Sequence, residues 1–199
     1  MPSPETKPRV PIALAAVALL FAVFLVVLVV QSLAPRRVAE FAITDRPRRP
    51  EPLPDGTVDT LTVDARSEAA WQFVDLDRGT VLALPDTASW DVAVRRFRVI
   101  ARHGAADLGP LPFDSARAAP AEGFTPLELG SDTLTPAFER WYRYGFFSHV
   151  LSPAGRTYAV RTNGGRVAKL DILGYYCRGA APGCLTFRYA FLPTAFAPR

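Results

Sequence analysis

The sequence YAVRTNGGRVAKLDIL, from Tyr158 to Leu173, decides the fold of this chain. Its centre, Asn163-Gly164-Gly165, separates two short runs rich in apolar residues. Asn-Gly between such runs is a strong β-hairpin signal, because the tight turn needs positive φ at its central residues. Downstream, residues 185–191 alternate large apolar residues with polar or small ones, the pattern of a half-buried strand. We therefore predict paired strands in this part of the chain.

The region before this hairpin also predicts β-structure. Trp90, Val92 and Val94 are apolar residues at a spacing of two, which is the period of a strand. After residue 35, no segment carries a long apolar stripe with helical periodicity. We predict an all-β, mainly antiparallel domain over residues 58–199.

The amino-terminal region predicts a membrane anchor after a tail of residues 1–11. Nineteen consecutive apolar residues run from Ile12 to Val30. As a helix they span about 29 Å, close to the roughly 30 Å hydrocarbon core of a bilayer. A cleaved signal peptide is the alternative, but its apolar core is about 7–15 residues long, and Pro35 follows the best small-residue site. No cysteine lies near the end of the run, so the sequence does not match a lipoprotein signal. We expect an uncleaved transmembrane helix over residues 12–34.

Residues 35–57 predict a Pro- and Arg-rich linker. Residues 35–55 hold five prolines and five arginines, a composition typical of an extended, semi-rigid spacer next to anionic lipid head groups. A literal count of flanking positive charges places the domain in the cytoplasm, whereas a short charged amino terminus before a long apolar run is the ordinary signal-anchor arrangement. We expect the second topology: a single-pass protein of the inner (cytoplasmic) membrane with its β-domain on the periplasmic side.

The two cysteines, Cys177 and Cys184, flank the loop between the last two predicted strands. If these strands pair, the cysteines meet at the mouth of the hairpin, and a disulfide there contributes about 2–3 kcal/mol. Two free thiols or half of a metal site are the alternatives. The spacing and the distant histidines argue against a metal, and no metal site is predicted. We predict a disulfide, which implies an oxidising compartment.

Charge is distributed unevenly along the predicted domain. Residues 58–139 carry 7 basic and 13 acidic side chains, whereas residues 140–199 carry 9 basic and 1 acidic. Either the two halves neutralise each other across the sheets, or arginines line a surface for an anionic partner such as porphyrin propionates, lipid phosphates or an acidic protein face. The candidate anion contacts are Arg95, Arg96, Arg98 and Arg143, the first three on one predicted strand and its exit.

Four segments resemble the HmuY family of haem-binding β-proteins. They are TLTVDARSEAAWQFVDLDRGTV (60–81), SWDVAVRRFRVIARHG (89–104), RTYAVRTNGGRVAKLDILGYYC (156–177) and GCLTFRYAF (183–191). The most specific are the W-D-x-A-x-x-R motif that starts at Trp90 and the Asn-Gly hairpin that ends in Tyr175-Tyr176. The resemblance covers most of residues 60–191. It implies an all-β, cell-surface or periplasmic protein that holds haem between two axial histidine or methionine side chains.

The haem ligands that this resemblance implies are missing at their places. One position corresponds to Phe146, five residues after Trp141, and the other falls in the loop of about residues 120–139, which holds neither His nor Met. The two histidines of the chain, His149 and His103, are therefore the candidate haem ligands, and haem is the candidate cofactor. Four tyrosines are either further ligands as tyrosinate or amphipathic residues of the sheet faces: Tyr142, Tyr144, Tyr175 and Tyr176.

The sequence holds no nucleophile-elbow, phosphate-loop, dinucleotide-binding or haem-attachment motif, so we expect a protein without enzymatic activity and without a nucleic-acid partner. Two functions remain open. The first is an accessory or interaction subunit of a larger membrane complex, respiratory or photosynthetic. The second is a membrane-tethered protein that binds haem or another tetrapyrrole. We favour the first, because the expected ligands are missing and the short linker keeps the domain near the bilayer.

Overall fold

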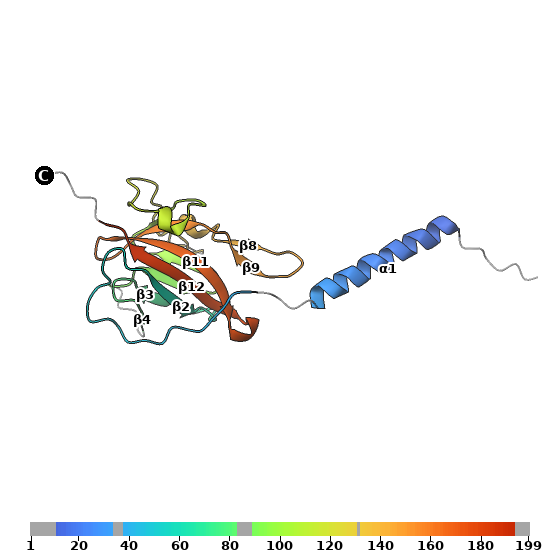
Figure 1. Ribbon diagram of the computed structural model, residues 1–199, viewed down its shortest axis with the longest axis horizontal. Coiled ribbons are helices and arrows are strands. Elements are labelled where there is room, and N and C mark those ends of the chain that lie inside the picture. Colours follow the sequence, from blue (N-terminus) through green and yellow to red (C-terminus); the bar gives the residue numbers. More distant parts are fainter. Residues whose placement is uncertain (1–10, 34–37, 83–88, 131, 194–199) are drawn as a thin grey trace, which may run out of the picture.

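The computed structural model describes residues 11–33, 38–82, 89–130 and 132–193. Residues 1–10 of the predicted tail therefore lie outside the described residues, as do Arg36 and Arg37 of the predicted linker and the last six positions of the predicted domain, 194–199. Within the described ranges, one apolar helix, α1 (Ile12–Leu33), is followed by a β-domain (Figure 1).

Helix α1 has the length and composition that crossing a membrane requires. Its 22 residues correspond to about 33 Å, and none of its side chains is buried by protein. A helix that is apolar all round and uncovered by protein suits lipid, because water would contact apolar surface on every side. The apolar helix predicted from the sequence is thus present.

The described part of the β-domain forms three mainly antiparallel sheets. The largest has the strand order β2-β12-β11-β10-β7, with β1 added in parallel beside β11; the second has the order β4-β3-β5-β6, and the third is the hairpin β8-β9. The strands are β1 (Glu40–Phe41), β2 (Asp59–Asp64), β3 (Gln72–Asp75), β4 (Thr80–Leu82), β5 (Val92–Arg95), β6 (Arg98–Ala101), β7 (Ala105–Asp107), β8 (Tyr142–Tyr144), β9 (Leu151–Pro153), β10 (Thr157–Arg161), β11 (Val167–Cys177) and β12 (Pro182–Phe191). Three single-turn 3-10 helices lie in the loops: η1 (Phe113–Ser115), η2 (Pro136–Phe138) and η3 (Arg178–Ala180).

The predicted Asn-Gly hairpin forms the centre of the largest sheet. Strand β10 pairs with β11 in register from Thr157 opposite Asp171 to Arg161 opposite Val167. In the connecting turn, Gly165 has a φ of 77°, whereas Asn163 and Gly164 do not have positive φ, so the positive value falls one residue later than the Asn-Gly pattern predicts. Strand β12 then pairs with β11 on the other side, so the predicted hairpin and the alternating run of residues 185–191 lie next to each other.

Strand β12 is buried on both faces, so the prediction of a half-buried strand was wrong. Its second face carries Thr186 and Ala190, which are fully buried. The loop helix η1 covers part of this face, because Lys169 of β11 and Arg188 of β12 lie over the Phe113 ring at 4.4 Å from its centroid. The alternating pattern identifies the strand but does not reveal a cover from another part of the chain.

The main core lies between the two larger sheets. Val74 and Val92 of the second sheet pack in one cluster with Tyr158 and Phe187 of the first. A smaller cluster around Trp90 lies on the other face of the second sheet. Strand β5 is therefore also buried on both sides.

The described part of the predicted linker is not a free spacer. Residues 38–57, here called the strap, lie along the β-domain. Strand β1 pairs with Tyr176 and Cys177 of β11, and Thr44 exchanges two hydrogen bonds with Thr62 on the free edge of β2, at 3.0 and 2.9 Å. Further along, Leu53 is buried in the main core. An uncovered strand edge offers unpaired backbone groups, and the strap satisfies them.

Candidate functional site

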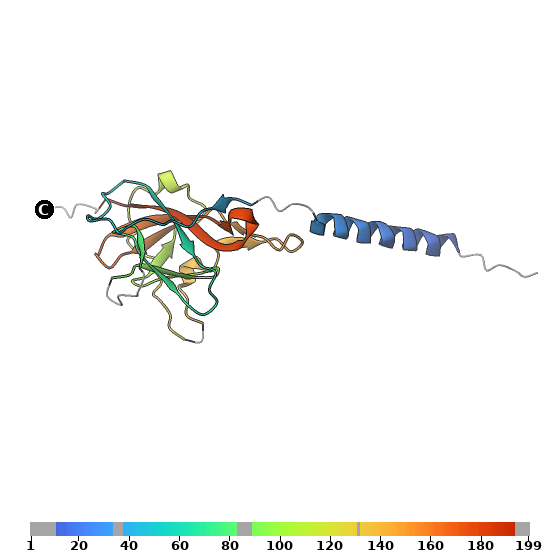
Figure 2. The same cartoon turned by 90° about the horizontal axis from the view of Figure 1, so that it is seen from below.

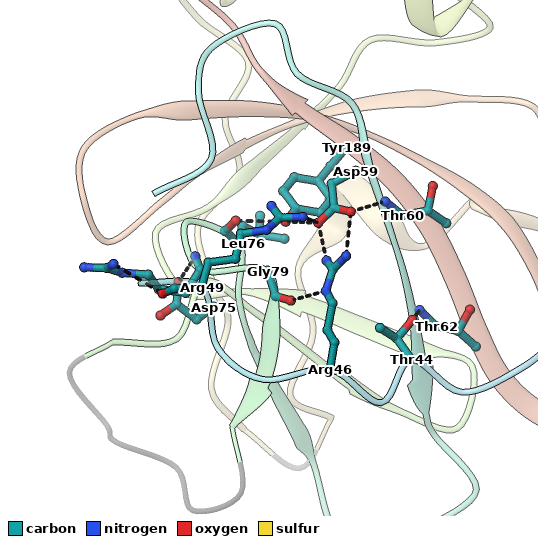
Figure 3. A network of polar contacts seen from close by, with 11 residues as sticks. Thr44, Arg46, Arg49, Asp59, Thr60, Thr62, Asp75, Leu76, Gly79 and Tyr189 are labelled. Atoms are coloured by element: carbon teal, nitrogen blue, oxygen red, sulfur yellow. Dashed lines mark hydrogen bonds and ion pairs between the residues drawn. The ribbon is translucent and has the colours of Figure 1, made fainter. Parts of the chain in front are cut away.

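Three strap arginines contact two buried aspartates of the β-domain (Figure 3). Asp59, 9% exposed, accepts hydrogen bonds from both terminal nitrogens of Arg46, and Arg49 Nη2 lies 3.0 Å from its Oδ2. Arg48 Nη2 lies 2.8 Å from Asp75 Oδ2. These arginines therefore neutralise protein carboxylates, which corrects the expectation that they face lipid head groups. The excess of acidic over basic side chains in residues 58–139 is the sequence signal that could have predicted this pairing.

The carboxylate of Asp59 stays charged in this site. Burial opposes its ionisation, but hydrogen bonds from Arg46 and Tyr189 outweigh burial and hold the pKa of this carboxyl below its ordinary value. Tyr189 Oη donates to Asp59 Oδ2 at 3.0 Å, and burial raises the pKa of this phenol, so it remains a neutral donor. The ionic centre fixes the strap on the domain and leaves only four residues, 34–37, between strap and α1.

A cleft of about 270 Å³ lies between the β5–β6 turn, the loop before η2 and strand β8. Its walls are aromatic: the rings of Phe97 and Tyr142 meet edge to face at 5.7 Å. Buried Trp141 supports the wall by donating Nε1–H to the carbonyl of Phe97 at 2.7 Å. At the rim, Arg98 contacts Asp132 at 3.0 Å. This cleft suits a small, flat apolar group with a polar edge.

The cleft does not fit haem held by two axial side chains. Its described lining residues include no His, Met or Cys, and its volume of about 270 Å³ lies just below the range of ligand pockets, about 300–1,000 Å³. Tyr142 is the one candidate tyrosinate ligand among them. Phe146, at the position of an implied family ligand, lies instead in the exposed β8–β9 loop. The HmuY-type ligand pair is therefore not assembled here.

The candidate ligands His103 and His149 lie at opposite ends of β11, so they cannot hold one haem together. His103 Nε2 is 3.2 Å from Asn163 Oδ1, in the turn before β11. His149 precedes β9, whose Leu151 donates its N–H to Tyr176 Oη at 2.9 Å near the other end. The 11 residues of β11 extend over roughly 33 Å. His149 itself is hydrogen-bonded to the hydroxyl of Tyr144.

The four candidate anion contacts do not converge on one site. Arg95 and Arg98 face each other across the β5–β6 hairpin, and Arg96, with a φ of 52°, lies in its turn, so they do not share one strand. The guanidinium of Arg95 stacks 4.6 Å from the Trp71 ring. Arg96 and Arg143 contact backbone carbonyls, at 3.4 and 3.5 Å. Only Arg98 borders the cleft among these four.

Tyr175 and Tyr176 have structural surroundings. Tyr175 is buried, and burial raises the pKa of its phenol, which disfavours a tyrosinate ligand. Tyr176 accepts the hydrogen bond from Leu151 that joins β9 to the main sheet. Both side chains belong to the main core, so neither is an amphipathic residue of an exposed sheet face.

Asp75, Asp77 and Asp91 form a compact acidic cluster, with carboxylate oxygens within 4.8 Å of one another. Each has protein partners: Asp91 accepts backbone hydrogen bonds from Leu76 and Asn163, both at 2.7 Å. Burial and the neighbouring charges of Asp77 and Asp75 raise the pKa of Asp91 to about 7 against those bonds. Arg48 and Arg166 pair with the other two carboxylates. The cluster is a junction between the second sheet, the hairpin loop and the strap.

The predicted disulfide joins Cys177 and Cys184, whose Cα atoms are 4.9 Å apart. The loop that it closes also receives the strap. Glu40 of β1 accepts hydrogen bonds from the N–H groups of Gly179 and Ala180, at 2.9 and 3.0 Å. The end of the domain where β1 pairs with β11 is thus tied by a covalent and a polar link.

Comparison with solved structures identifies the fold as HmuY-like, as the resemblance predicts. The chain is similar to an apo HmuY analog from Tannerella forsythia (TM-score 0.57, 15% identity, 70% of this chain and 99% of that one). It is also similar to a Bacteroides vulgatus protein described as an HmuY-like haem-binding protein (0.58, 16%, 74% and 99%). A third similar structure is a Bacteroides fragilis protein described as a lipoprotein (0.57, 18%, 69% and 91%). Comparisons with protein-family models and with curated proteins find no match.

These observations define the class: an HmuY-like, mainly antiparallel β-domain that follows an apolar helix. At these identities the similarity establishes the fold alone.

Proposed function

We propose that this protein is a non-enzymatic accessory subunit of a larger membrane complex, respiratory or photosynthetic. Helix α1 anchors it in the inner membrane as a single-pass protein, and the β-domain lies on the periplasmic side. The disulfide between Cys177 and Cys184 supports an oxidising compartment.

The attachment of the strap to the β-domain is the observation that supports this proposal. Its pairing with β11, its ionic centre at Asp59 and the burial of Leu53 fix it on the β-domain. Only the four residues 34–37 therefore separate the strap from α1, so the domain reaches only molecules in or at the membrane. A protein that collects a diffusing ligand gains from a long tether, whereas a subunit that presents one face to a membrane neighbour gains from a short one.

A second candidate function is the binding of haem or another tetrapyrrole. The aromatic walls of the cleft, formed with Phe97 and Tyr142, support it, as does Arg98 at the rim, which suits a carboxylate. The names of the similar structures also include haem binding. In such a complex, Tyr142 is the ligand candidate within the cleft, and His149 the candidate outside it.

Two measurements on the full chain separate these functions. In the first, the chain is purified from its native membranes in a mild detergent and its elution is followed. An accessory subunit co-elutes with larger membrane proteins in a fixed ratio, and Asp59→Asn, which loosens the strap, reduces this ratio. Elution alone, at the size of a 21.7 kDa chain with its micelle, would overturn the proposal.

The second measurement is a haemin titration of the same preparation followed by absorbance. The accessory-subunit proposal expects no saturable Soret shift. A one-to-one shift that is lost in Tyr142→Phe or in His149→Ala would establish the second function and identify its ligand. Arg95→Ala is the matched control, because Arg95 stacks on Trp71 and does not line the cleft.

A further inference from the structure

The turn of the β8–β9 hairpin, residues 145–149, is here called the tip, and it exposes two adjacent aromatic rings. Phe146 is 75% exposed and Phe147 62%, with ring centroids 5.4 Å apart. Two backbone hydrogen bonds close the tip: Gly145 N–H donates to the Val150 carbonyl at 2.8 Å, and His149 N–H to the Gly145 carbonyl at 2.7 Å. Large adjacent apolar side chains exposed to water mark an interaction surface.

The tip lies at the end of the β-domain from which the chain continues to α1. Leu151, two residues after the tip, donates a hydrogen bond to Tyr176. Tyr176 in turn pairs with Glu40 of the strap. Because four residues connect Leu33 to Val38, the strap begins within about 18 Å of the end of the helix.

Helix and tip border a common space. The side chains of Phe146 and Phe147 line a hollow of about 610 Å³ together with the last turns of α1, including Val29 and Ser32. Both ribbon views show the β8–β9 hairpin extending toward the same side as α1 (Figures 1 and 2). If α1 spans a bilayer, the tip is at the level where the helix leaves it.

The charge around the hairpin suits a phospholipid surface. Arg143, on β8 beside the tip, is exposed, as is Arg140 just before the strand. No acidic residue occurs between Glu139 and Asp171. Exposed aromatic rings flanked by arginines are the composition of membrane-interface anchors, because the rings enter the acyl boundary while the guanidinium groups remain among anionic head groups.

We propose that the tip inserts Phe146 and Phe147 into the interface of the phospholipid bilayer that α1 spans, with Arg143 among the head groups. This inference rests on the anchoring role of α1 in the proposed function. With two attachment points, helix and tip, the β-domain has one fixed orientation on the membrane. A fixed orientation presents the opposite faces of the domain consistently to neighbouring proteins.

The test uses the full chain in nanodiscs of phosphatidylcholine and phosphatidylglycerol, with no other protein. Ser148→Cys places a nitrobenzoxadiazole label in the exposed tip, while the native cysteines remain in their disulfide. Asn163→Cys, exposed at the opposite end of β11, is the matched control. We expect blue-shifted emission and several-fold weaker iodide quenching for the tip label, and quenching by lipids with acyl-chain nitroxides. The control label shows none of these effects.

The outcomes separate the inference from the anchoring on which it rests. A chain that fails to co-elute with nanodiscs overturns both. A chain that co-elutes but whose tip label is quenched by iodide as strongly as the control overturns tip insertion alone, and a protein partner then becomes the occupant to test. In Phe146→Ser/Phe147→Ser, iodide quenching of the tip label must rise to the control value. Unchanged shielding would show that these rings do not drive insertion, which would also overturn the proposal.

Discussion

Replacing Asp59 by Asn tests the ionic centre that holds the strap. The side chain keeps its shape but loses its charge, and one oxygen that accepts a hydrogen bond becomes an amide donor. In the structure this carboxylate accepts hydrogen bonds from Arg46 and Tyr189 and forms an ion pair with Arg49. Charged hydrogen bonds contribute about 1.5–3 kcal/mol each, and removing one partner of a buried ion pair costs about 3–5 kcal/mol.

The arginine side chains are 29% exposed, so the cost lies below that of a fully buried ion pair. We expect Asp59→Asn to reduce the free energy of unfolding by about 2–3 kcal/mol, a decrease of roughly 4–12 °C in Tm for a chain of this size. Because its ionised form is the one stabilised, the wild-type contribution is present above the ordinary aspartate pKa and is lost as the pH falls through the lower, folded-state pKa. The variant loses this acid-dependent part.

Thermal unfolding of the full chain in detergent measures the total effect, and amide hydrogen exchange shows where it acts. The strap amides of Thr44 and Leu53, bonded to Thr62 and Asp77, are expected to exchange faster in the variant. Arg66→Ala is the control: its side chain is 59% exposed and that of its partner Asp64 is 38% exposed, so almost no change in stability is expected. If Asp59→Asn changes stability no more than Arg66→Ala and leaves strap exchange unaltered, the ionic centre does not hold the strap.

Three further predictions concern other parts of the domain. Replacing Cys177 and Cys184 by Ser should lower stability by about 2–3 kcal/mol, because the disulfide closes a loop with a sequence separation of 7; equal unfolding with and without reductant in the wild type would contradict this. The pKa of Asp91 is raised from 3.8 to about 7, so the folded chain binds this proton more tightly than the unfolded chain. The free energy of unfolding should therefore fall by about 2–3 kcal/mol between pH 5 and 8. Denaturant titrations of Asp91→Asn should no longer show this pH dependence. Gly174→Ala would place a Cβ 2.6 Å from the Phe41 ring, so we expect a loss of about 1–3 kcal/mol with faster exchange in the strap, and unchanged strap protection would argue against this contact.

The strap changes what the amino-terminal region does for the domain. A segment rich in proline and arginine closes the free edge of β2, neutralises Asp59 and Asp75, and inserts Leu53 into the core. The β-domain therefore begins near residue 38. Its distance from α1 is limited by the four residues between Leu33 and Val38. A truncated fragment that starts at residue 56 would lack this cover, so binding experiments need the full chain.

Features of this chain that depend only on neighbouring residues were predicted from the sequence. The turn at Asn163-Gly164-Gly165 requires positive φ whatever surrounds it, the run of residues 12–30 is apolar enough for lipid, and Cys177 and Cys184 meet because the strands on either side of a short loop pair. The HmuY-like segments likewise indicated the fold.

The tertiary structure alone decided the features whose partners are distant in the chain. The composition of the strap is that of a solvated spacer, and only the approach of Asp59 and Asp77 makes it a packed segment. Likewise, the loop that carries Phe113 decides that β12 is buried on both faces. The separation of His103 from His149 follows from the direction of β11. A side chain is exposed, paired or available to a ligand according to what the rest of the chain places against it, and local pattern carries no information about that.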